Sequence, residues 1–570
     1  MAEKIVQNDE TGGSSVLNLL ENSVSRRDLG RMVAAAAATA GVVGIAPGMV
    51  GAAAAFAAAA QDTPPSGGSI VVARAGDSDS LDPAHTTAGI AFQVFNNIYD
   101  TLIGFNMELT YEGILAESWE PAADGLSYTF ILRQGITFHD GTEFNADAVK
   151  FNFDRLIAPE TNAPAAGWVQ ALIGTEVVDP YTVKLLLSEP FSPLLGNLCL
   201  AYFGIASPTA VQELGDEFAQ NPVGTGPWKF KEWISGESIT LVPNENYQNF
   251  HSYMTNKGAP YAEELVFRNI PESQTQLAAF ETGEVNVITI PPREVVRLEE
   301  DDAYQVFKRD KGTGITFLEF SMDKVEPGAF GATYKAPFDD LRVRQAVGYA
   351  INAEEIIESV LEGLAARNYG PMPNGMFAFK PEIEEYGFHF DVEKAKTLLD
   401  EAGWLDPGDG IREKDGTKLA PLLWTWTDGV NDRIVQVFQN QLAEAGFDVK
   451  IELMEVATLL ARLVENVSDF DLMGWGWPEP HIMKMMVESE SGVGRYKDET
   501  YHGLVDAATK TSDLAERTDL YFQASQKMLA DAAMIPLWTV LEVVGVRSEV
   551  KDYKPGPQGY KAYEDIYFED

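Results

Sequence analysis

The sequence predicts an α/β protein with more than one domain. Segments in which apolar and polar residues alternate, the pattern of half-buried strands, recur between segments of helical periodicity. One stretch combines the two patterns, because strands at 265–270 and 285–290 flank a helix at 272–282, and such a β-α-β unit implies parallel strands. The chain has 570 residues, more than the roughly 100–200 residues of a single domain.

The composition is that of a soluble globular protein, with 45% hydrophobic and 22% charged residues. A formal net charge of −44 argues against nucleic acid and anionic membrane surfaces as partners. It describes the surface and does not fix the sign of a ligand. The single cysteine, Cys199, excludes an intramolecular disulfide and a four-cysteine zinc site, and its leucine neighbours indicate a small buried hydrophobe.

Residues 1–60 are expected to be an export signal that is not part of the fold. The sequence SRRDLG at 25–30 is similar to a twin-arginine motif, and an alanine-rich apolar run follows over 32–60. Small residues end this run and suit a signal peptidase, so Gln61 is the expected mature start. No cysteine lies there, which excludes lipoprotein attachment. A retained membrane anchor remains the alternative, although the alanine and glycine content makes a weak membrane helix.

The stretch 116–149 contains a turn, two strands and the start of a helix. Turn residues stand at 123–125, and a half-buried strand follows over 126–132, where every second residue is apolar. A shorter strand is expected at 136–139. Asn145 can then cap a helix by accepting a hydrogen bond from a free backbone N–H.

This stretch resembles, nearly residue for residue, the signature of the family 5 extracellular solute-binding proteins of ABC importers. That pattern reads A-x-S-W, then D-G-x-x-Y-x-F-x-L-R-x-G-I-x-F-H-D-G, then A-D-A-V, and all three pieces are present. NPVGTGPW at 221–228 and PFDDLRVRQA at 337–346 are similar to further family segments. The resemblance covers essentially 69–560. These residues are expected to be scaffold and not to form the binding site.

The resemblance implies an α/β two-lobe periplasmic-binding-protein-like fold of type II, in the large cluster with an extra subdomain in the first lobe. Its expected division is a linker at 61–68, lobe I at 69–310 with a subdomain inserted at 109–222, lobe II at 311–541, and a return to lobe I at 542–570. The chain would cross between the lobes twice, near 311–314 and 540–544. Two crossings permit hinge bending without disrupting either core.

The function that the resemblance implies is that of an extracytoplasmic substrate-binding protein of an ABC importer. Such a protein captures a small solute between its lobes and delivers it to the permease subunits. We expect a monomer in the periplasm or at the cell surface, with no cofactor, metal or catalytic activity. A peptide or peptide-like amine is the first choice of ligand, followed by an oligosaccharide and then a nickel chelate. A secreted hydrolase is the alternative from another class, but the sequence has no G-x-S-x-G, H-E-x-x-H or phosphate loop.

Two Trp-x-Trp pairs, Trp424/Trp426 and Trp475/Trp477, are the leading candidates for ligand contacts. In extended segments each pair projects both indoles to one face. Together they hold four of the ten tryptophans, which suits an aromatic wall of a cleft. The alternative is that one member of each pair belongs to the core.

The segment after the second pair departs from the peptide-binding relatives. Those carry an aspartate, in a W-x-x-D-Y-x-D/E-P pattern, that pairs with the peptide's amino terminus. This chain reads WGWPEPH over 475–481, two residues shorter and without that aspartate. Glu479 is the candidate replacement as the counter-ion of an amine, with a structural role at the end of the loop as the alternative.

Three further candidates have weaker signals. His481 occupies the position where some nickel-chelate relatives place a metal-binding histidine, but the six histidines show no paired spacing, so no metal site is assigned. Arg433, near an expected helix start, would suit a ligand carboxylate by bidentate bonding. His85 lies in a loop after the first strand. For both, a surface position without a role is the alternative.

Overall fold

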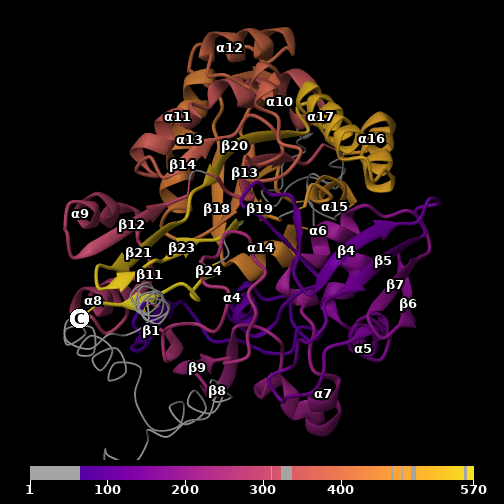
Figure 1. Ribbon diagram of the computed structural model, residues 1–570. Coiled ribbons are helices and arrows are strands. Elements are labelled where there is room, and N and C mark those ends of the chain that lie inside the picture. Colours follow the sequence, from indigo (N-terminus) through magenta and orange to yellow (C-terminus); the bar gives the residue numbers. More distant parts are fainter. Residues whose placement is uncertain are drawn as a thin grey trace, which may run out of the picture. The chain divides into compact units, whose positions relative to one another are not determined.

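The computed structural model describes residues 64–309, 311–322, 337–463, 467–477, 479–488, 496–557 and 561–569 (Figure 1). The expected export signal and its cleavage point lie outside these residues. The chain divides into two compact units, 1–66 and 67–570, and all that follows concerns the second. Within the described parts of the chain, none of the helices combines the length and the apolar character needed to cross a membrane.

The first of two large sheets has seven strands in the order β12-β21-β11-β1-β10-β9-β8. Their bounds are β1 (Ser69–Arg74), β8 (Trp228–Ile234), β9 (Ser238–Pro243), β10 (Glu264–Asn269), β11 (Val287–Thr289), β12 (Tyr304–Lys308) and β21 (Val543–Arg547). The predicted β-α-β unit is confirmed as β10, α8 (Ser273–Thr282) and β11, and its two strands flank β1 in parallel.

The second large sheet has six strands in the order β14-β20-β13-β19-β17-β18. Their bounds are β13 (Gly314–Phe320), β14 (Ala365–Arg367), β17 (Leu422–Trp426), β18 (Lys450–Met454), β19 (Phe470–Gly476) and β20 (Met534–Val540). Strand β17 runs parallel to both of its neighbours, β18 and β19. Both Trp-x-Trp pairs therefore stand at the ends of parallel strands.

Helices cover both faces of the six-stranded sheet (Figure 1). On one face the core includes residues of α10 (Leu341–Ala350), α11 (Ala353–Ser359), α12 (Val392–Glu401) and α13 (Asn431–Ala445). On the other it includes residues of α14 (Val456–Arg462), α15 (Ile482–Glu488), α16 (Glu499–Lys510) and α17 (Leu514–Ala530). Strand residues alternate between the faces, so Leu472 packs on the first and Met473 on the second.

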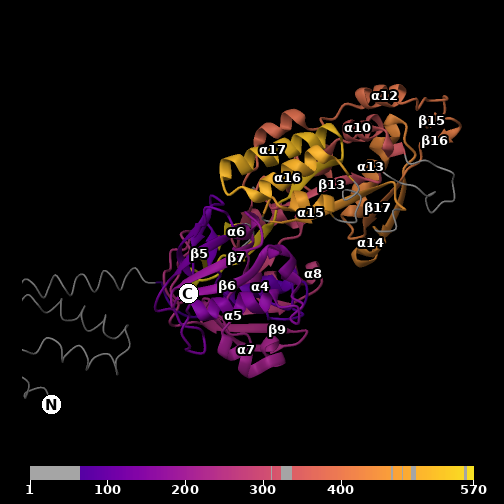
Figure 2. The ribbon, with the colours of Figure 1, turned by 90° about the vertical axis from the view of Figure 1, so that its right-hand side faces the viewer.

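The signature stretch supplies two strands, β4 and β5, of a separate four-stranded antiparallel sheet, β4-β5-β7-β6, against which α5 packs (Figure 2). Its elements are β4 (Ala116–Pro121), β5 (Ser127–Leu132), β6 (Leu172–Asp179), β7 (Thr182–Leu187) and α5 (Ala146–Ile157). The cap is confirmed, because the side chain of Asn145 accepts a hydrogen bond from the Ala148 N–H at 3.1 Å. The expected strand at 136–139 is wrong: one bridge, Thr137 to Glu143, forms there, since positive-φ turns at Gly135 and Gly141 leave no room for a ladder.

Shorter elements complete the described chain. Those between β1 and β12 are α4 (Gly89–Ile98), β2 (Ile103–Phe105), β3 (Tyr111–Gly113), η1 (Pro164–Val169), α6 (Pro193–Leu198), η2 (Ala201–Phe203), α7 (Pro208–Leu214), η3 (Gly215–Gln220), η4 (Pro292–Glu294) and α9 (Val295–Glu299), where η marks a 3-10 helix. Those after β13 are η5 (Pro337–Asp339), η6 (Pro381–Tyr386), β15 (Glu413–Lys414), β16 (Thr417–Lys418), β22 (Val550–Lys551), β23 (Lys554–Pro555), β24 (Lys561–Ala562) and β25 (Tyr567–Phe568).

The chain passes between the two large sheets twice, from β12 to β13 and back from β20 to β21. The two crossing segments touch, because the backbone N–H of Arg309 donates to the carbonyl of Glu542 at 3.2 Å. Gly312 of the first segment lies against the loop that holds Gly375, whose N–H donates to the Gly312 carbonyl at 2.9 Å. A Cβ added at Gly375 would lie 2.6 Å from that carbonyl oxygen, so the contact requires glycine.

Candidate functional site

The carboxyl ends of parallel strands meet at one edge of each large sheet. In the first sheet these are the ends of β1, β10, β11 and β12. Strand β12 has the same direction as β11, because both run antiparallel to β21. In the second they are the ends of β17, β18 and β19. Both crossing segments leave the sheets at these edges. Since ligands of α/β proteins bind outside the carboxyl ends of strands, these two edges are the candidate site.

Trp424 lies inside the core and does not reach this edge. Its side chain is fully buried and its indole N–H donates to a carboxylate oxygen of Glu452 at 2.8 Å. The Arg462 guanidinium lies over the ring, 4.3 Å from its centroid. In this structure Trp424 therefore supports the sheet from within.

Trp426 is at the edge itself, as the last residue of β17. It is half-buried, and its indole N–H donates to the Asp428 carboxylate at 2.9 Å. The same carboxylate accepts the backbone N–H groups of Val430 and Asn431, at the start of α13. A Cβ added at Gly474 of β19 would lie 3.5 Å from the Trp426 ring, so glycine leaves this indole uncovered on that side.

Trp475 and Trp477 continue the same edge on β19 and just beyond it. Trp475 is half-buried and lies opposite Ile315 of β13. The backbone N–H of Trp477 donates to the Thr313 carbonyl in the first crossing segment at 3.2 Å. Its indole N–H is buried and has no hydrogen-bond partner among the described residues. Trp426, Trp475 and Trp477 all pack against the same hydrophobic cluster, on one face of the six-stranded sheet.

An aromatic row connects Trp477 to the first lobe. Its ring contacts Trp168 of η1 with centroids 4.2 Å apart, Trp168 contacts Tyr202 of η2 at 5.3 Å, and Tyr202 contacts Phe92 of α4 at 4.8 Å. Burial, with the charge of Asp79 nearby, raises the pKa of Tyr202 to about 12. No motif marks Trp168 or Tyr202 as site residues, because they meet only through the tertiary fold.

The Glu479 carboxylate forms a buried ion pair. Its two carboxylate oxygens accept from both terminal nitrogens of Arg517, at 2.5 and 3.1 Å, and both side chains are buried. Burial raises the pKa of the Glu479 carboxyl, and the Arg517 guanidinium opposes that rise. A Cβ added at Gly196 of α6 would lie 2.6 Å from this carboxylate, so α6 closes over the pair. In this arrangement Glu479 holds a guanidinium of its own chain in place of a ligand amine.

His481 is also buried, with its ring edge-on to Phe191 at a centroid distance of 5.4 Å. Burial, together with the charges of Arg517 and Lys484, lowers its pKa to about 3, so the imidazole is neutral at physiological pH. Its Nδ1 has no hydrogen-bond partner among the described residues. The described parts of the chain contain no group of three or more His, Cys, Asp or Glu side chains arranged to hold a metal ion.

Arg433 lies near the edge of the six-stranded sheet, and His85 lies near the edge of the seven-stranded sheet. Arg433 is half-buried in the first turn of α13, which follows β17, and its Nε donates to the Gly429 carbonyl at 3.2 Å. His85 is exposed in the loop after β1, with Nδ1 3.3 Å from a carboxylate oxygen of Asp82. The structure thus brings Arg433 near Trp426, and places His85 on the opposite lobe.

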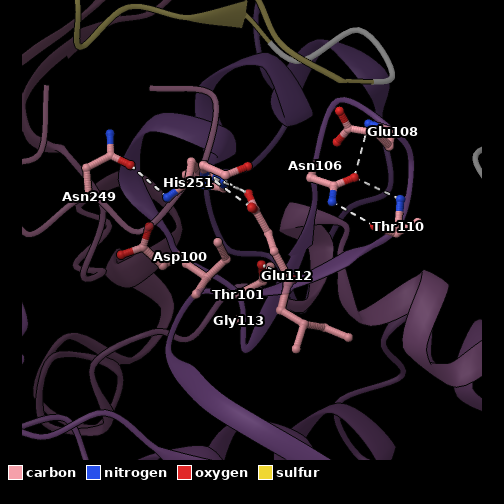
Figure 3. Close-up of polar contacts among 12 residues, drawn as sticks. Asp100, Thr101, Asn106, Glu108, Thr110, Glu112, Gly113, Asn249 and His251 are labelled. Atoms are coloured by element: carbon pink, nitrogen blue, oxygen red, sulfur yellow. Dashed lines mark hydrogen bonds and ion pairs between the residues drawn. The ribbon is translucent and has the colours of Figure 1, made fainter. Parts of the chain in front are cut away.

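A second polar cluster lies within the first lobe (Figure 3). The Glu112 carboxylate is 3.5 Å from Nδ1 of His251, and the Asp100 carboxylate accepts the hydroxyls of Thr225 and Tyr247. Burial raises the pKa of Asp100, while His251 opposes the rise. These groups line or adjoin a cavity that also meets Glu564, whose pKa burial raises to about 7.

Comparisons with known proteins agree on one family. The sequence profile of the bacterial extracellular solute-binding proteins, family 5 Middle, matches residues 110–494. A glutathione-binding protein, GsiB of Pectobacterium atrosepticum, is 28% identical over 511 residues, covering 87% of this chain and 93% of that protein. Heme-binding protein A of Haemophilus influenzae is 27% identical over 527 residues, covering 85% and 89%.

Solved structures give the same result. The periplasmic binding protein DppA from Helicobacter pylori, in complex with the peptide STSA, is 30% identical with a TM-score of 0.71, covering 89% of this chain and 99% of that one. NikA from Brucella suis, in complex with Fe(III)-EDTA, is 28% identical with a TM-score of 0.76, covering 88% and 100%. The two-lobe fold and the substrate-binding role expected from the signature stretch are confirmed.

Proposed function

The chain belongs to the family 5 bacterial extracellular solute-binding proteins of ABC importers, and we propose that it captures a short peptide or peptide-like amine between its two lobes. The family is periplasmic or extracytoplasmic. Support for a peptide comes from the similarity to a glutathione-binding protein and to a peptide-bound DppA.

The main support for the proposed site is that three half-buried indoles lie at the carboxyl edge of the six-stranded sheet. Trp426, Trp475 and Trp477 form the aromatic wall, which suits the side chains of a peptide. Arg433 and His85 lie at the rims of the two sheets. Trp424, Glu479 and His481 are buried and are not part of this wall: Glu479 pairs with Arg517, and the His481 ring packs on Phe191.

Capture is proposed to work by hinge bending around the two crossing segments. The proposed boundaries are lobe I at 69–310 with a subdomain inserted at 109–222, lobe II at 311–541 and the return to lobe I at 542–570, and the two passages of the chain between the large sheets support them. A ligand that touches both lobes stabilises a closed form, which the permease can distinguish from the empty one. The protein breaks no bond in this scheme and acts as a monomer.

Export is proposed to use the twin-arginine route, with cleavage before Gln61 and no lipid attachment. The basis is the SRRDLG motif followed by an alanine-rich run. Mass spectrometry of the protein from the envelope fraction would find Gln61 at the amino terminus. Retention of residues 1–60 would contradict cleavage and favour the anchor.

An oligosaccharide is the second candidate ligand, because the aromatic row suits sugar faces and the amine-binding aspartate is missing. A nickel chelate ranks below it, since His481 is buried against Phe191. A hydrolase is the alternative of another class, and release of product from labelled oligosaccharides would favour it.

A thermal-shift screen followed by calorimetry tests the choice of ligand. The panel is di- and tripeptides, glutathione, cello- and xylo-oligosaccharides, and nickel-histidine. A ligand that binds the folded state raises the melting temperature, and a concentration of 100 times Kd adds about 2.7 kcal/mol. We expect a shift with peptides and none with sugars. A shift with sugars alone would replace the peptide proposal by the oligosaccharide one.

A further inference from the structure

A pocket lies beside the first crossing segment, at the hinge. Its walls come from the crossing segment, the β2–β3 hairpin, the loop of lobe II that holds Gly375, and residues 555–557 near the C-terminus. Its hollow measures about 760 Å³ when the space that is open to solvent is included. A group that occupies it touches elements of both lobes and the hinge at once.

One side of this pocket is cationic although the chain as a whole is strongly acidic. Lys308, Arg309 and Lys311 line it. Lys308 is 2.8 Å from Glu299, and Arg309 is 3.9 Å from Glu542. The exposed side chain of Lys311 makes no ion pair or hydrogen bond with any other described residue. Asp310 lies outside the described residues. Lys311 is therefore the cation available to an incoming anion.

The other side is apolar and has an unusual backbone. Met107 and Leu109, at the tip of the β2–β3 hairpin, line the pocket together with Pro555 and Pro557. Leu109 has a φ of +62°, which costs free energy for a residue with a branched side chain.

The hairpin tip is fixed in this conformation by one side chain (Figure 3). The Asn106 amide oxygen accepts the backbone N–H groups of Glu108 and Thr110, at 3.1 and 2.9 Å, and its nitrogen donates to the Thr110 hydroxyl at 2.7 Å. The strained tip thus places Leu109 at the pocket, while the side chain of Met107 is 51% exposed.

The pocket adjoins the aromatic wall. Thr313 lines it, and the Thr313 carbonyl accepts the backbone N–H of Trp477. A ligand chain that contacts both Trp477 and the pocket would therefore lie along the first crossing segment. One end of such a ligand would meet indoles and the other an ammonium group beside apolar side chains.

Resting on the proposed function, we propose that this hinge pocket binds the carboxylate end of the ligand, with Lys311 as its counter-ion and Met107 and Leu109 against the adjoining apolar side chain. The ligand class is then a short peptide or peptide-like acid with a free terminal carboxylate. Lys311 acts as a specificity residue for this carboxylate. A hydrogen bond between the Lys311 ammonium group and a carboxylate is charge-assisted. Such a bond is strong enough to select an acid over its neutral amide.

The test compares trialanine with its C-terminal amide by calorimetry. The proteins are the wild type, Lys311→Met, and the control Lys418→Met, which makes the same charge change in the distant β15–β16 hairpin. We expect the wild type and the control to bind the acid at least fivefold more tightly than the amide. Lys311→Met should bind both with the affinity of the amide. An unchanged preference, or an equal loss for acid and amide, overturns the proposal.

A second probe separates this proposal from the peptide function. The peptide function fails if none of the di- and tripeptides or glutathione binds, and 4-methylpentanoate, an acid with an apolar tail, then tests the pocket by ligand-detected NMR. Binding to the wild type and the control but not to Lys311→Met would support the pocket. Absence of binding to the wild type, or equal binding to all three proteins, would overturn it.

Discussion

The indole of Trp477, just beyond β19, meets the indole of Trp168, in η1, with their planes at 82° and their centroids 4.2 Å apart. The two residues are separated by about three hundred positions and belong to different lobes. Edge-to-face contacts of this kind contribute about 0.5–1.5 kcal/mol beyond the burial of area. The contact therefore ties the end of the proposed aromatic wall to the first lobe.

Truncation of this contact is expected to weaken ligand binding. Trp477→Ala removes both the wall and the contact, so we expect at least a tenfold higher Kd for a confirmed ligand, measured by calorimetry. Trp168→Ala should have a smaller effect. Trp119→Ala, in β4 of the four-stranded sheet, is the control and should leave Kd unchanged. If Trp477→Ala binds as tightly as the wild type, the assignment of the wall is wrong.

Removal of one partner of the Glu479–Arg517 pair is expected to destabilise the fold strongly. Glu479→Gln leaves a buried guanidinium without its counter-charge, and such changes cost about 3–5 kcal/mol. Denaturant unfolding measures this. The control, Asp448→Asn, breaks an exposed pair with Lys450 and should cost less than about 1 kcal/mol. Equal effects of the two variants would show that the buried pair is not critical.

Addition of one methyl group at the hinge is expected to be costly. The Cβ of Gly375→Ala would lie within 3 Å of three backbone atoms of Gly312, so we expect a loss of about 1–3 kcal/mol of unfolding free energy. Gly503→Ala, in the interior of α16, meets nothing within 4 Å and should gain about 0.5–1 kcal/mol. Thermal unfolding distinguishes the two, and a stabilised Gly375→Ala would contradict the tight contact.

Glu564 is expected to make stability depend on pH. Burial raises its pKa from 4.5 to about 7, so between these values the folded protein keeps a proton that the unfolded chain has released. Its contribution to the unfolding free energy therefore falls by about 3 kcal/mol at most as pH rises from 4.5 to 7. Above pH 7 the contribution is constant. Glu564→Gln removes this term, so its stability relative to the wild type should increase over that window in urea titrations at pH 5, 6, 7 and 8. Parallel curves would contradict the shifted pKa. Glu569→Gln, at an exposed position, is the control.

The sequence was sufficient for the parts of the fold that local chemistry determines. Alternation of apolar residues predicted β5, the cap at Asn145 followed from its side chain, and the signature stretch identified the two-lobe architecture. The strand expected at 136–139 failed because alternation over four residues does not reveal that glycines on both sides turn the chain away from a partner.

The site was harder to predict because it depends on which distant residues meet. Periodicity placed Trp424 and Trp426 on one face of β17, but only the packed sheet shows that the first is buried and the second is at the edge. Nothing in the loop around Glu479 indicates that Arg517, 38 residues later, lies opposite it. Lys311 carries no motif, and its place in a pocket follows from the hairpin and C-terminal segments that surround it.

The central claim is that two lobes close on a small ligand. Small-angle X-ray scattering of the purified protein, with and without a saturating peptide that calorimetry shows to bind one to one, tests it most directly. We expect a smaller radius of gyration in the bound state. Superimposable profiles for the empty and the fully occupied protein would contradict it.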